Sequence, residues 1–489
     1  MSDFQLTKSR FTSGLQCHKK LWWEVHEPDA RELQPDKVLQ DLFNQGREVG
    51  IHARTRYPGG ILIDLPYEAR DQRAAATREA LKDGAPAIFE ATFLASDTLV
   101  KIDVLEKVNG GYRITEVKSS NSQKPEHIGD VAVQQSVAEA CGLKISETQV
   151  LHLNDNFRHP DSGNLFAGTD VTTPVAAFLP QVPDEIAHQR AMLTGPIPSV
   201  PVGAQCFEPH ECPFFHRCWP DTPDHIGNLA GVGPKKTVAY LTRGIESISE
   251  LPPTEKLNFT QKRQLKAMAE NRLIVEPTLA DTLAPLTSAQ RLGFLDFETI
   301  LRAIPVWPGM APWQPAAAQF SYHERQSDGT YTHSAHLAEG PLDARPPLAV
   351  AMLRATANAD RIATYSSYEK TRIRELQRAL PDLAEELGKL ESKLIDLLPV
   401  VRDCVYHPAF NGSFSLKAIL TPLVPELTYS DLVIVDGRIA SVEIARLLFV
   451  ADKIPKQERD RVRGELLDYC ERDTWAMVRL VEVLGDLAS

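Results

Sequence analysis

The chain of 489 residues lacks the features that mark several special classes of protein. It has no run of 18 or more apolar residues, which argues against a transmembrane helix. Its N-terminus, Met-Ser-Asp-Phe-Gln-Leu-Thr-Lys, lacks the apolar centre of a secretory signal peptide. Only seven residues are cysteine, too few for a disulfide framework in so long a chain. We therefore expect a cytoplasmic protein with no membrane partner.

Basic residues are also in short supply. The chain has 53 Lys and Arg against 65 Asp and Glu, a formal net charge of −12. A nonspecific binder of polyanions is normally basic, so this balance counts against that class. It leaves room for a nucleic-acid enzyme in which a local basic groove or bound cations make the contact. Hydrophobic residues are 43% and charged residues 24%, as in folded proteins, and the length predicts two to four domains.

The clearest candidate site lies at residues 293–299, which read Gly-Phe-Leu-Asp-Phe-Glu-Thr. If this apolar run is a strand, Asp296 and Glu298 point to one face with Phe294, and the intervening Leu and Phe point to the other. Two like charges in a mostly buried strand are costly, so they indicate a raised pKa or a bound divalent cation. Such a pair suits two-metal phosphodiester chemistry. The alternative is a strand at a sheet edge with both acids in solvent.

Short strands followed by a helix are predicted in the first half. The pattern becomes alternating near residue 87, and Asn-Gly-Gly at 109–111 supplies a tight hairpin turn. Antiparallel pairing across that turn brings Asp103 opposite the face that Glu116 and Lys118 share. The expected strands cover 88–94, 99–108 and 112–117, and the expected helix covers 127–142, with Asp130 and Gln134 one turn apart.

Asp103, then Glu116-x-Lys118, then Gln134 on the next helix resembles the core of the PD-(D/E)xK nucleases, in their RecB-like branch. The resemblance implies a restriction-endonuclease-like fold in which Asp103 and Glu116 hold Mg²⁺ or Mn²⁺ against a scissile phosphate. The cation lowers the pKa of a water, which Lys118 helps to position or activate. A solvated cross-face pair is the alternative for the Glu-x-Lys motif alone.

One metal ligand of the RecB-like enzymes has no counterpart at the expected position of this sequence. These enzymes usually have a metal-binding His on the first core helix, four residues after a Gly. On the amphipathic helix predicted at 38–56, Gly46 is followed at that spacing by Gly50. Either His52 or Glu48 substitutes, or the ligand is missing.

Four cysteines suggest a metal site that joins distant parts of the chain. Three recur at steps of six in a Pro-rich loop region, and one stands alone in a helix predicted at 8–26. This pattern resembles the iron–sulfur nucleases, including AddB and the CRISPR-associated RecB-like nucleases, and implies a structural [4Fe–4S] cluster that clips the domain ends together. The alternative is structural Zn²⁺, with His210 or His216 replacing a thiol. The four are Cys17, Cys206, Cys212 and Cys218.

A possible DNA contact follows the cysteines. Residues 229–236 read Leu-Ala-Gly-Val-Gly-Pro-Lys-Lys and resemble a helix-hairpin-helix turn. Its Gly-x-Gly lets backbone N–H groups approach a DNA phosphate at a helix N-terminus, with Lys235 and Lys236 beside it. An ordinary turn between packed helices is the alternative.

A late helix extends the motif around residue 296. Tyr469 and Asp473 are four apart on an amphipathic helix predicted at 466–480, so they share one face. Alone, that pair would indicate a solvated helix face. With Asp-x-Glu it resembles the DEDD 3′–5′ exonucleases, in the DnaQ-like branch of the RNase H fold. The resemblance implies that Asp296, Glu298 and Asp473 bind two metal ions with a fourth acid, and that Tyr469 orients the attacking water.

The fourth acid departs from the family pattern. The family usually has Asn-x-x-Phe-Asp after a later strand, whereas this chain has Ser-Ser-Tyr-Glu ending at Glu369. Glu369 is a competent oxygen ligand with one extra methylene, and Asp396 and Asp403 are alternatives. Residues 407–429 resemble the Ser-Leu-Lys segment of the YprB-like exonucleases, in which Lys417 would meet a phosphate.

These resemblances together imply a bacterial family that fuses two nuclease-like halves. The expected α/β multidomain fold has a PD-(D/E)xK domain with an Fe–S clip at 1–222, a small helical linker of the helix-hairpin-helix kind at 223–286, and an RNase H-like domain at 287–489. The expected activity is Mg²⁺- or Mn²⁺-dependent hydrolysis of DNA, exonucleolytic, with two candidate sites. The alternatives are a DNA-end-binding scaffold with one or both sites inactive, and an RNA exonuclease.

Overall fold

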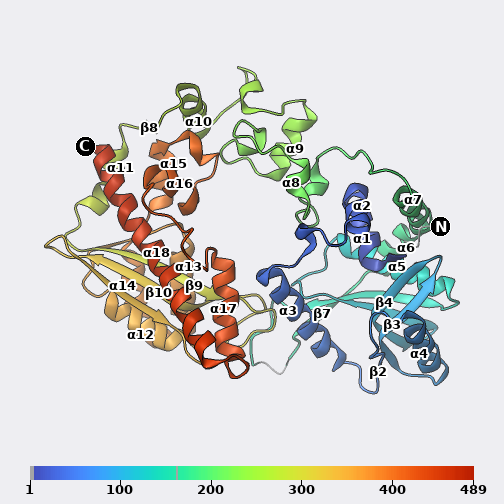
Figure 1. The fold of residues 1–489 in the computed structure, drawn as a ribbon. Coiled ribbons are helices and arrows are strands. Elements are labelled where there is room, and N and C mark those ends of the chain that lie inside the picture. The colour runs from blue at the N-terminus through green and yellow to red at the C-terminus, as the bar shows by residue number, and fades with distance from the viewer. Residues whose placement is uncertain (1–4, 161–162) are drawn as a thin grey trace. The chain divides into compact units, whose positions relative to one another are not determined.

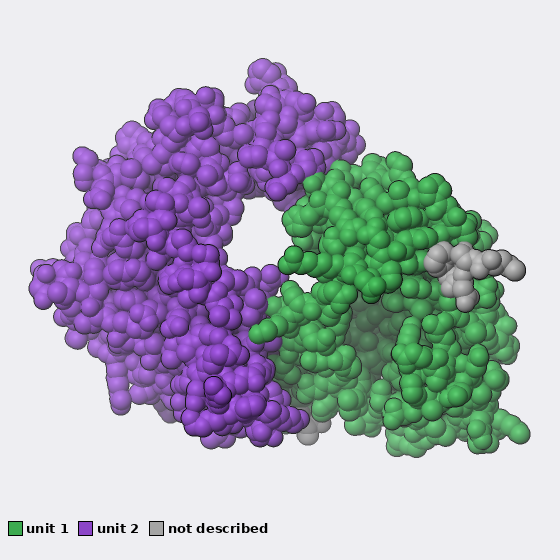
Figure 2. Space-filling view, in the orientation of Figure 1, with its two compact units in different colours: residues 1–219, 302–313 green, residues 220–301, 314–489 purple. Residues whose placement is uncertain are grey.

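The computed structural model describes residues 5–160 and 163–489 and is α/β, with mixed sheets and many helices. The chain divides into two compact units (Figure 2). Unit 1 comprises residues 1–219 and 302–313, and unit 2 comprises residues 220–301 and 314–489. No helix among the described residues has the length and apolar character needed to cross a membrane.

Unit 1 is built on a seven-stranded sheet in the order β2-β3-β4-β5-β6-β7, with β1 beside the start of β4 (Figure 1). The three predicted strands form an antiparallel meander, and β6 runs parallel to β5. Val108 pairs with Gly111 across the predicted hairpin, where Gly110 has a φ of +89°, which favours glycine. The strands are β1 (Leu6–Thr7), β2 (Ile61–Leu62), β3 (Ala87–Ala95), β4 (Thr98–Val108), β5 (Gly111–Val117), β6 (Ile145–Leu153) and β7 (Phe166–Asp170).

The helices of unit 1 cover this sheet and carry part of the site. Val131, Val133 and Val137 of α5 pack into one apolar core with Ile102 and Ile114 of the sheet. The helix predicted at 8–26 is two helices, because Cys17 takes an extended conformation between them. The helices are α1 (Lys8–Gln16), α2 (His18–His26), α3 (Lys37–Arg54), α4 (Arg70–Lys82), α5 (Glu126–Ala140), α6 (Thr172–Phe178), α7 (Val182–Leu193) and α8 (Phe215–Cys218).

A loop from far along the chain, residues 302–313, completes unit 1. Its Ala303 N–H donates to Gln45 Oε1 of α3 at 2.6 Å. Its Trp313 indole N–H donates to the carbonyl of Ser119 at 2.5 Å, just after β5. These contacts fix the loop beside the carboxyl end of β5.

Unit 2 is built on a five-stranded sheet in the order β11-β10-β9-β12-β13. β10 is antiparallel to β9 and β11, whereas β12 and β13 run parallel to β9. The strand that carries Asp296 and Glu298 is therefore central, and the edge-strand alternative is wrong. The strands are β9 (Leu292–Ile300), β10 (Ala316–Arg325), β11 (Tyr331–Leu337), β12 (Arg361–Thr364) and β13 (Leu394–Asp396); β8 (Ile274–Val275) pairs separately with β14 (Val405–Tyr406).

The two faces of this sheet belong to different cores, as the alternation along β9 predicted. Phe294 packs with α11 and α18, whereas Leu295 and Phe297 pack with α12, α13 and α14 on the opposite face. Figure 1 shows α12 and α14 on one side of this sheet and α18 on the other. The carboxylates of β9 share the face of Phe294 and therefore lie beneath α18. The helices are α9 (Pro234–Thr242), α10 (Phe259–Glu270), α11 (Leu279–Thr287), α12 (Arg345–Ala355), α13 (Tyr368–Ala379), α14 (Ala384–Ser392), α15 (Leu397–Cys404), α16 (Leu416–Leu423), α17 (Gly437–Phe449) and α18 (Lys456–Ala488).

Candidate functional site

Three carboxylates of unit 2 converge between the sheet and α18. Asp296 and Glu298 come from β9 and Asp473 from α18, and one oxygen of each lies within 4.8 Å of the others. Glu298 is 7% exposed, Asp473 is 9% exposed, and Asp296 is partly buried. Among residues 5–160 and 163–489, no lysine or arginine forms an ion pair with any of the three. The group is therefore a concentration of buried acids without an ion pair, and the charge of Lys417 only partly opposes the rise that burial causes in their pKa values.

The proximity of these acids disfavours their charged forms. Burial and the repulsion of Asp473 hold the pKa of Asp296 well above its usual range. Burial, Asp296 and Asp473 do the same to the pKa of Glu298. Burial also raises the pKa of Asp473, although a hydrogen bond from Tyr429 opposes that shift. A divalent cation among these oxygens would restore their ionisation, so the donor set fits a hard metal ion.

Glu369 is a fourth acid facing the same group. It lies in the first turn of α13 and is 3% exposed. Burial and the charge of Asp296 hold its pKa well above the usual range. Its Oε2 atom is buried and has no hydrogen-bond partner among the described residues. A buried oxygen without a partner is costly, which makes Glu369 a fitting additional ligand.

The two alternative fourth acids have structural partners instead. Asp396 caps α15, since its carboxylate accepts hydrogen bonds from the backbone N–H groups of Leu398 at 2.9 Å and Ser366 at 2.8 Å. Asp403 is exposed and pairs with the neighbouring Arg402 at 2.8 Å. The structure thus brings Glu369, and neither alternative, to the acidic group.

Lys417 and two tyrosines border the carboxylates. Lys417 Nζ donates to the Tyr469 hydroxyl at 3.1 Å and lies 4.9 Å and 5.0 Å from the ring centroids of Tyr469 and Tyr429. The Tyr429 hydroxyl donates to Asp473 Oδ1, and Cys470 Sγ donates to Asp296 Oδ2 at 3.6 Å. Lys417, which was predicted from a different motif than Tyr469 and Asp473, lies beside both of them. No sequence pattern singled out Tyr429 or Cys470.

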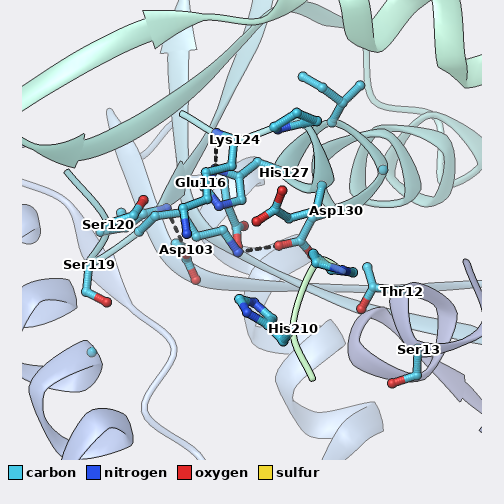
Figure 3. A pocket seen from close by; sticks show the side chains of 18 of the residues that line it. Thr12, Ser13, Asp103, Glu116, Ser119, Ser120, Lys124, His127, Asp130 and His210 are labelled. Carbon is cyan, nitrogen blue, oxygen red and sulfur yellow. Dashed lines mark hydrogen bonds and ion pairs between the residues drawn. The ribbon is translucent and has the colours of Figure 1, made fainter. Parts of the chain in front are cut away.

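The residues predicted for the first site also come together, in unit 1. The Val117 N–H donates to Asp103 Oδ2 at 2.8 Å, which places Asp103 beside the strand of Glu116. Gln134 Nε2 donates to Glu116 Oε2 at 2.7 Å, and Lys118 Nζ lies 2.8 Å from Glu116 Oε1. Figure 3 shows Asp103 and Glu116 of this group from close by.

A lysine that no motif predicted neutralises this first site. Lys8, the first residue of α1, has its Nζ 2.7 Å from Glu116 Oε1 and 3.5 Å from Asp130 Oδ1. Lys118 pairs with Asp130 as well. Burial would raise the pKa of Glu116, but Lys118 and Lys8 outweigh it and hold that pKa below its usual range. Burial and the charge of Glu116 raise the pKa of Asp103 to about 7.

The first site opens into a cleft of about 1880 Å³ within unit 1. Gly46 and Gly50 of α3 line the cleft, whereas His52 is exposed and does not. Glu48 also lies outside the lining and pairs with Arg302 at 3.1 Å. Neither of the two predicted substitutes therefore lies in the lining of the cleft. The other lining residues include basic side chains (Lys20, Arg47, Arg54, Lys101 and Lys124) and exposed apolar ones of α3 (Leu39, Leu42, Phe43 and Ile51).

The cysteine segments approach each other in unit 1. Gln16 Nε2 donates to the carbonyls of Gln205 at 2.8 Å and His210 at 2.7 Å, which ties the end of α1 to the cysteine loop. Burial raises the pKa of Cys212 to about 11, and Cys17 and Cys206 lie close enough to add to that rise. Cys218 is half-buried at the end of α8, and all four thiols are free.

The predicted hairpin turn lies in unit 2 at the start of α9. Gly231 has a φ of +70°, and Gly233 caps the helix without a side-chain hydrogen bond. Lys235 and Lys236 are exposed in the first turn. The backbone and both lysines are thus accessible at this helix end.

Comparison with known proteins gives one family match that bears on unit 2. A model described as a domain of unknown function, DUF2779, matches residues 293–415. The matched region contains Asp296, Glu298 and Glu369 and ends before Lys417 and Asp473. No curated protein matches the chain.

Proposed function

We propose that the protein is a divalent-metal-dependent nuclease that hydrolyses phosphodiester bonds of DNA, acting exonucleolytically. The observation that carries the proposal is the buried group of Asp296, Glu298 and Asp473, in which the described residues supply no ion pair. The buried Oε2 of Glu369 has no hydrogen-bond partner among the described residues, and burial and the charge of Asp296 raise the pKa of its carboxyl group. Carboxylate oxygens are the ligands that Mg²⁺ and Mn²⁺ prefer.

The arrangement of unit 2 supports an RNase H-like fold. In chain order its strands are arranged 3-2-1-4-5, with the second antiparallel to its neighbours and the last two parallel to the first. That order is the one expected for the DnaQ-like resemblance. The acids lie on the first strand, after the fourth strand and on the C-terminal helix, as in the DEDD pattern.

In this proposal each residue has a separate task. A bound Mg²⁺ or Mn²⁺ pair supplies Lewis acidity at the scissile phosphate and lowers the pKa of a water. Asp296, Glu298, Asp473 and Glu369 hold the cations. The Tyr469 hydroxyl accepts a hydrogen bond from Lys417 and also contacts the carboxylate of Asp473, which places it where it would orient the attacking water. Lys417 would contact the phosphate, because its charge acts on all three carboxylates of the group.

Unit 1 is proposed as a second nuclease site with a PD-(D/E)xK core. Its support is that Asp103, Glu116 and Lys118 line the cleft and that the buried Gln134 hydrogen-bonds Glu116. Basic side chains and exposed apolar ones line the cleft, which suits a strand whose phosphates and bases are both contacted. Lys8 occupies part of the space where a cation would meet Glu116, so this site fits a metal less well than unit 2 does.

The four cysteines are proposed to hold a structural [4Fe–4S] cluster, supported by the approach of Cys17, Cys206 and Cys212. Anaerobic purification should give a brown protein with iron and inorganic sulfide in equal amounts. Stoichiometric zinc in a colourless protein would replace the cluster with the Zn²⁺ alternative. The exposed Lys235 and Lys236 are proposed to contact a DNA phosphate.

A nuclease panel tests the proposed function. End-labelled single-stranded DNA, double-stranded DNA and RNA are incubated with wild type and Asp296→Asn in Mg²⁺ and in Mn²⁺. We expect shortening of DNA from its ends, and in Asp296→Asn a fall of about 100-fold or more in the component of cleavage that belongs to unit 2. Asp328→Asn, on the exposed turn between β10 and β11, is the matched control and should cleave like wild type.

Other outcomes distinguish the alternatives. Cleavage of RNA alone would make the protein an RNA exonuclease. Equal binding of DNA ends by wild type and Asp296→Asn, without cleavage and without Mn²⁺ binding at millimolar concentration, would make it a scaffold.

A further inference from the structure

A second group of potential metal ligands lies on the α18-covered face of the unit 2 sheet and shares no residue with the four carboxylates. His323 of β10 and His333 of β11 are directly opposite each other in the antiparallel register, with ring centroids 4.5 Å apart. Glu471 of α18 places its Oε2 atom 3.7 Å from His333 Nδ1. One atom from each of the three residues lies within 4.8 Å of the others.

Hydrogen bonds behind the rings fix which nitrogen atoms are available. The Thr474 hydroxyl contacts the Glu471 carbonyl at 3.0 Å, and a carbonyl only accepts, so Thr474 donates there. Ser321 Oγ, 2.8 Å from Thr474 Oγ1, must then donate to it. His323 Nδ1, 2.8 Å from the same oxygen, must also donate. His333 Nε2, 2.9 Å from Ser321 Oγ, must donate in turn.

This is the one arrangement that supplies each of the four contacts with its own proton. It leaves His323 Nε2 and His333 Nδ1 as the free lone pairs. Burial and the neighbouring His333 lower the pKa of His323 to about 4, so its ring is neutral at neutral pH. Metal-binding histidines commonly donate their second N–H to an oxygen in this way.

We propose that His323 Nε2, His333 Nδ1 and the Glu471 carboxylate bind a Zn²⁺ ion. Two imidazoles and one carboxylate favour zinc over Mg²⁺, whereas the four carboxylates of the candidate nuclease site favour the harder ion. His333 and Glu471 are exposed, so a water can complete the coordination. The ion would tie the edge strand β11 to α18 and stabilise this side of the sheet.

A second group with two histidines is a weaker candidate for a metal site. His18, Glu185 and His188 of unit 1 also meet the 4.8 Å criterion. There the Glu185 Oε1 atom already accepts hydrogen bonds from His18 at 2.9 Å and from Gln189 at 2.9 Å. Among the described residues, no side chain other than His333 lies against the Glu471 carboxylate of the unit 2 triad.

The test compares zinc content among full-length variants. Wild type, His333→Ala and the control His336→Ala are loaded with Zn²⁺ and dialysed against buffer that contains excess Mg²⁺, and the metal is counted by mass spectrometry. His336 lies on the opposite face of β11 and stacks on Phe320. We expect His333→Ala to hold one zinc fewer per chain than wild type and His336→Ala. The cysteines and the other triad remain in all three proteins, so the difference isolates this site.

Two further measurements distinguish the loss of a zinc ligand from a folding defect in His333→Ala. Zn²⁺ should raise the melting temperature of His336→Ala more than that of His333→Ala, because a ligand stabilises only a protein that binds it. Glu471→Gln should lose the same equivalent of zinc without changing either ring. Equal zinc in wild type and His333→Ala, or loss from His336→Ala as well, would overturn the proposal.

Discussion

The buried carboxylate of Glu298 destabilises the folded protein when no metal is bound. The pKa of this acid is raised in the folded state, so the folded state binds more protons than the unfolded state above the ordinary value of 4.5. Stability is therefore full below that value and falls as the pH rises toward the raised pKa. Glu298→Gln removes the charge, and we expect it to raise the free energy of unfolding in EDTA by about 1–3 kcal/mol at neutral pH.

Thermal unfolding in EDTA and in Mn²⁺ measures this effect. The variant should unfold at a higher temperature than wild type in EDTA, and Mn²⁺ should stabilise it less than it stabilises wild type. Glu386→Gln, on the exposed surface of α14, is the control and should behave like wild type. A Glu298→Gln protein less stable than wild type in EDTA would contradict the electrostatic account.

Asp103 gives a defined pH window. Its ordinary pKa of 3.8 is raised to about 7 by burial and Glu116, so metal-free stability is full below about pH 4 and is lost as the pH rises to about 7. Asp103→Asn should flatten the melting temperature over that window. The exposed Asp83→Asn should leave the slope as it is in wild type. An unchanged slope in Asp103→Asn would place the titration elsewhere.

At the scale of elements, α1 brings a cation to the first site. Lys8 neutralises Glu116 and Asp130, so Lys8→Met leaves those acids with Lys118 alone. We expect the variant to melt at a lower temperature in EDTA and to bind Mn²⁺ more tightly in calorimetric titrations. Lys82→Met, exposed at the end of α4, is the control. Weaker Mn²⁺ binding by Lys8→Met would show that Lys8 supports the metal rather than competing with it.

α18 contributes Asp473 to the carboxylate group and Glu471 to the histidine triad. Its Thr474 hydroxyl contacts His323 of that triad. Thr474→Val removes the hydroxyl that accepts from His323, so the ring loses the contact that fixes its free nitrogen. We expect zinc affinity to fall about 10–100-fold, measured by competition with a chelator. Thr421→Val, exposed on α16, should keep the wild-type affinity. Unchanged affinity in Thr474→Val would mean that the hydroxyl does not orient the ring.

Helices and strands were predictable from the sequence where apolar residues recur at a regular spacing. Alternation along residues 293–299 predicted both the strand and the face of its carboxylates, because strand geometry has a period of two. The break at Cys17 was missed, since its extended backbone interrupts an amphipathic pattern that continues on both sides. α18 is also longer than the helix predicted at 466–480.

The candidate sites were predictable only for residues within recognisable motifs. Lys8 meets Glu116 across 108 positions, and Tyr429 meets Asp473 across 44. Neither lies at a spacing that a strand or helix would place together, so only the tertiary structure reveals them. Glu369 was found by its position after a strand, but the choice among it, Asp396 and Asp403 required knowing which acid is already hydrogen-bonded.

At the scale of the whole molecule, the two candidate nuclease sites belong to different compact units. All the carboxylates of each site come from a single unit, so a substitution in one site should leave the activity of the other site intact. We expect Glu116→Gln and Asp296→Asn each to remove a separate component of cleavage, distinguished by substrate preference, and the double variant to remove both. If Asp296→Asn alone abolishes all cleavage, the unit 1 site does not cut nucleic acid. Lys8 then takes the place of the metal ion beside Glu116 permanently.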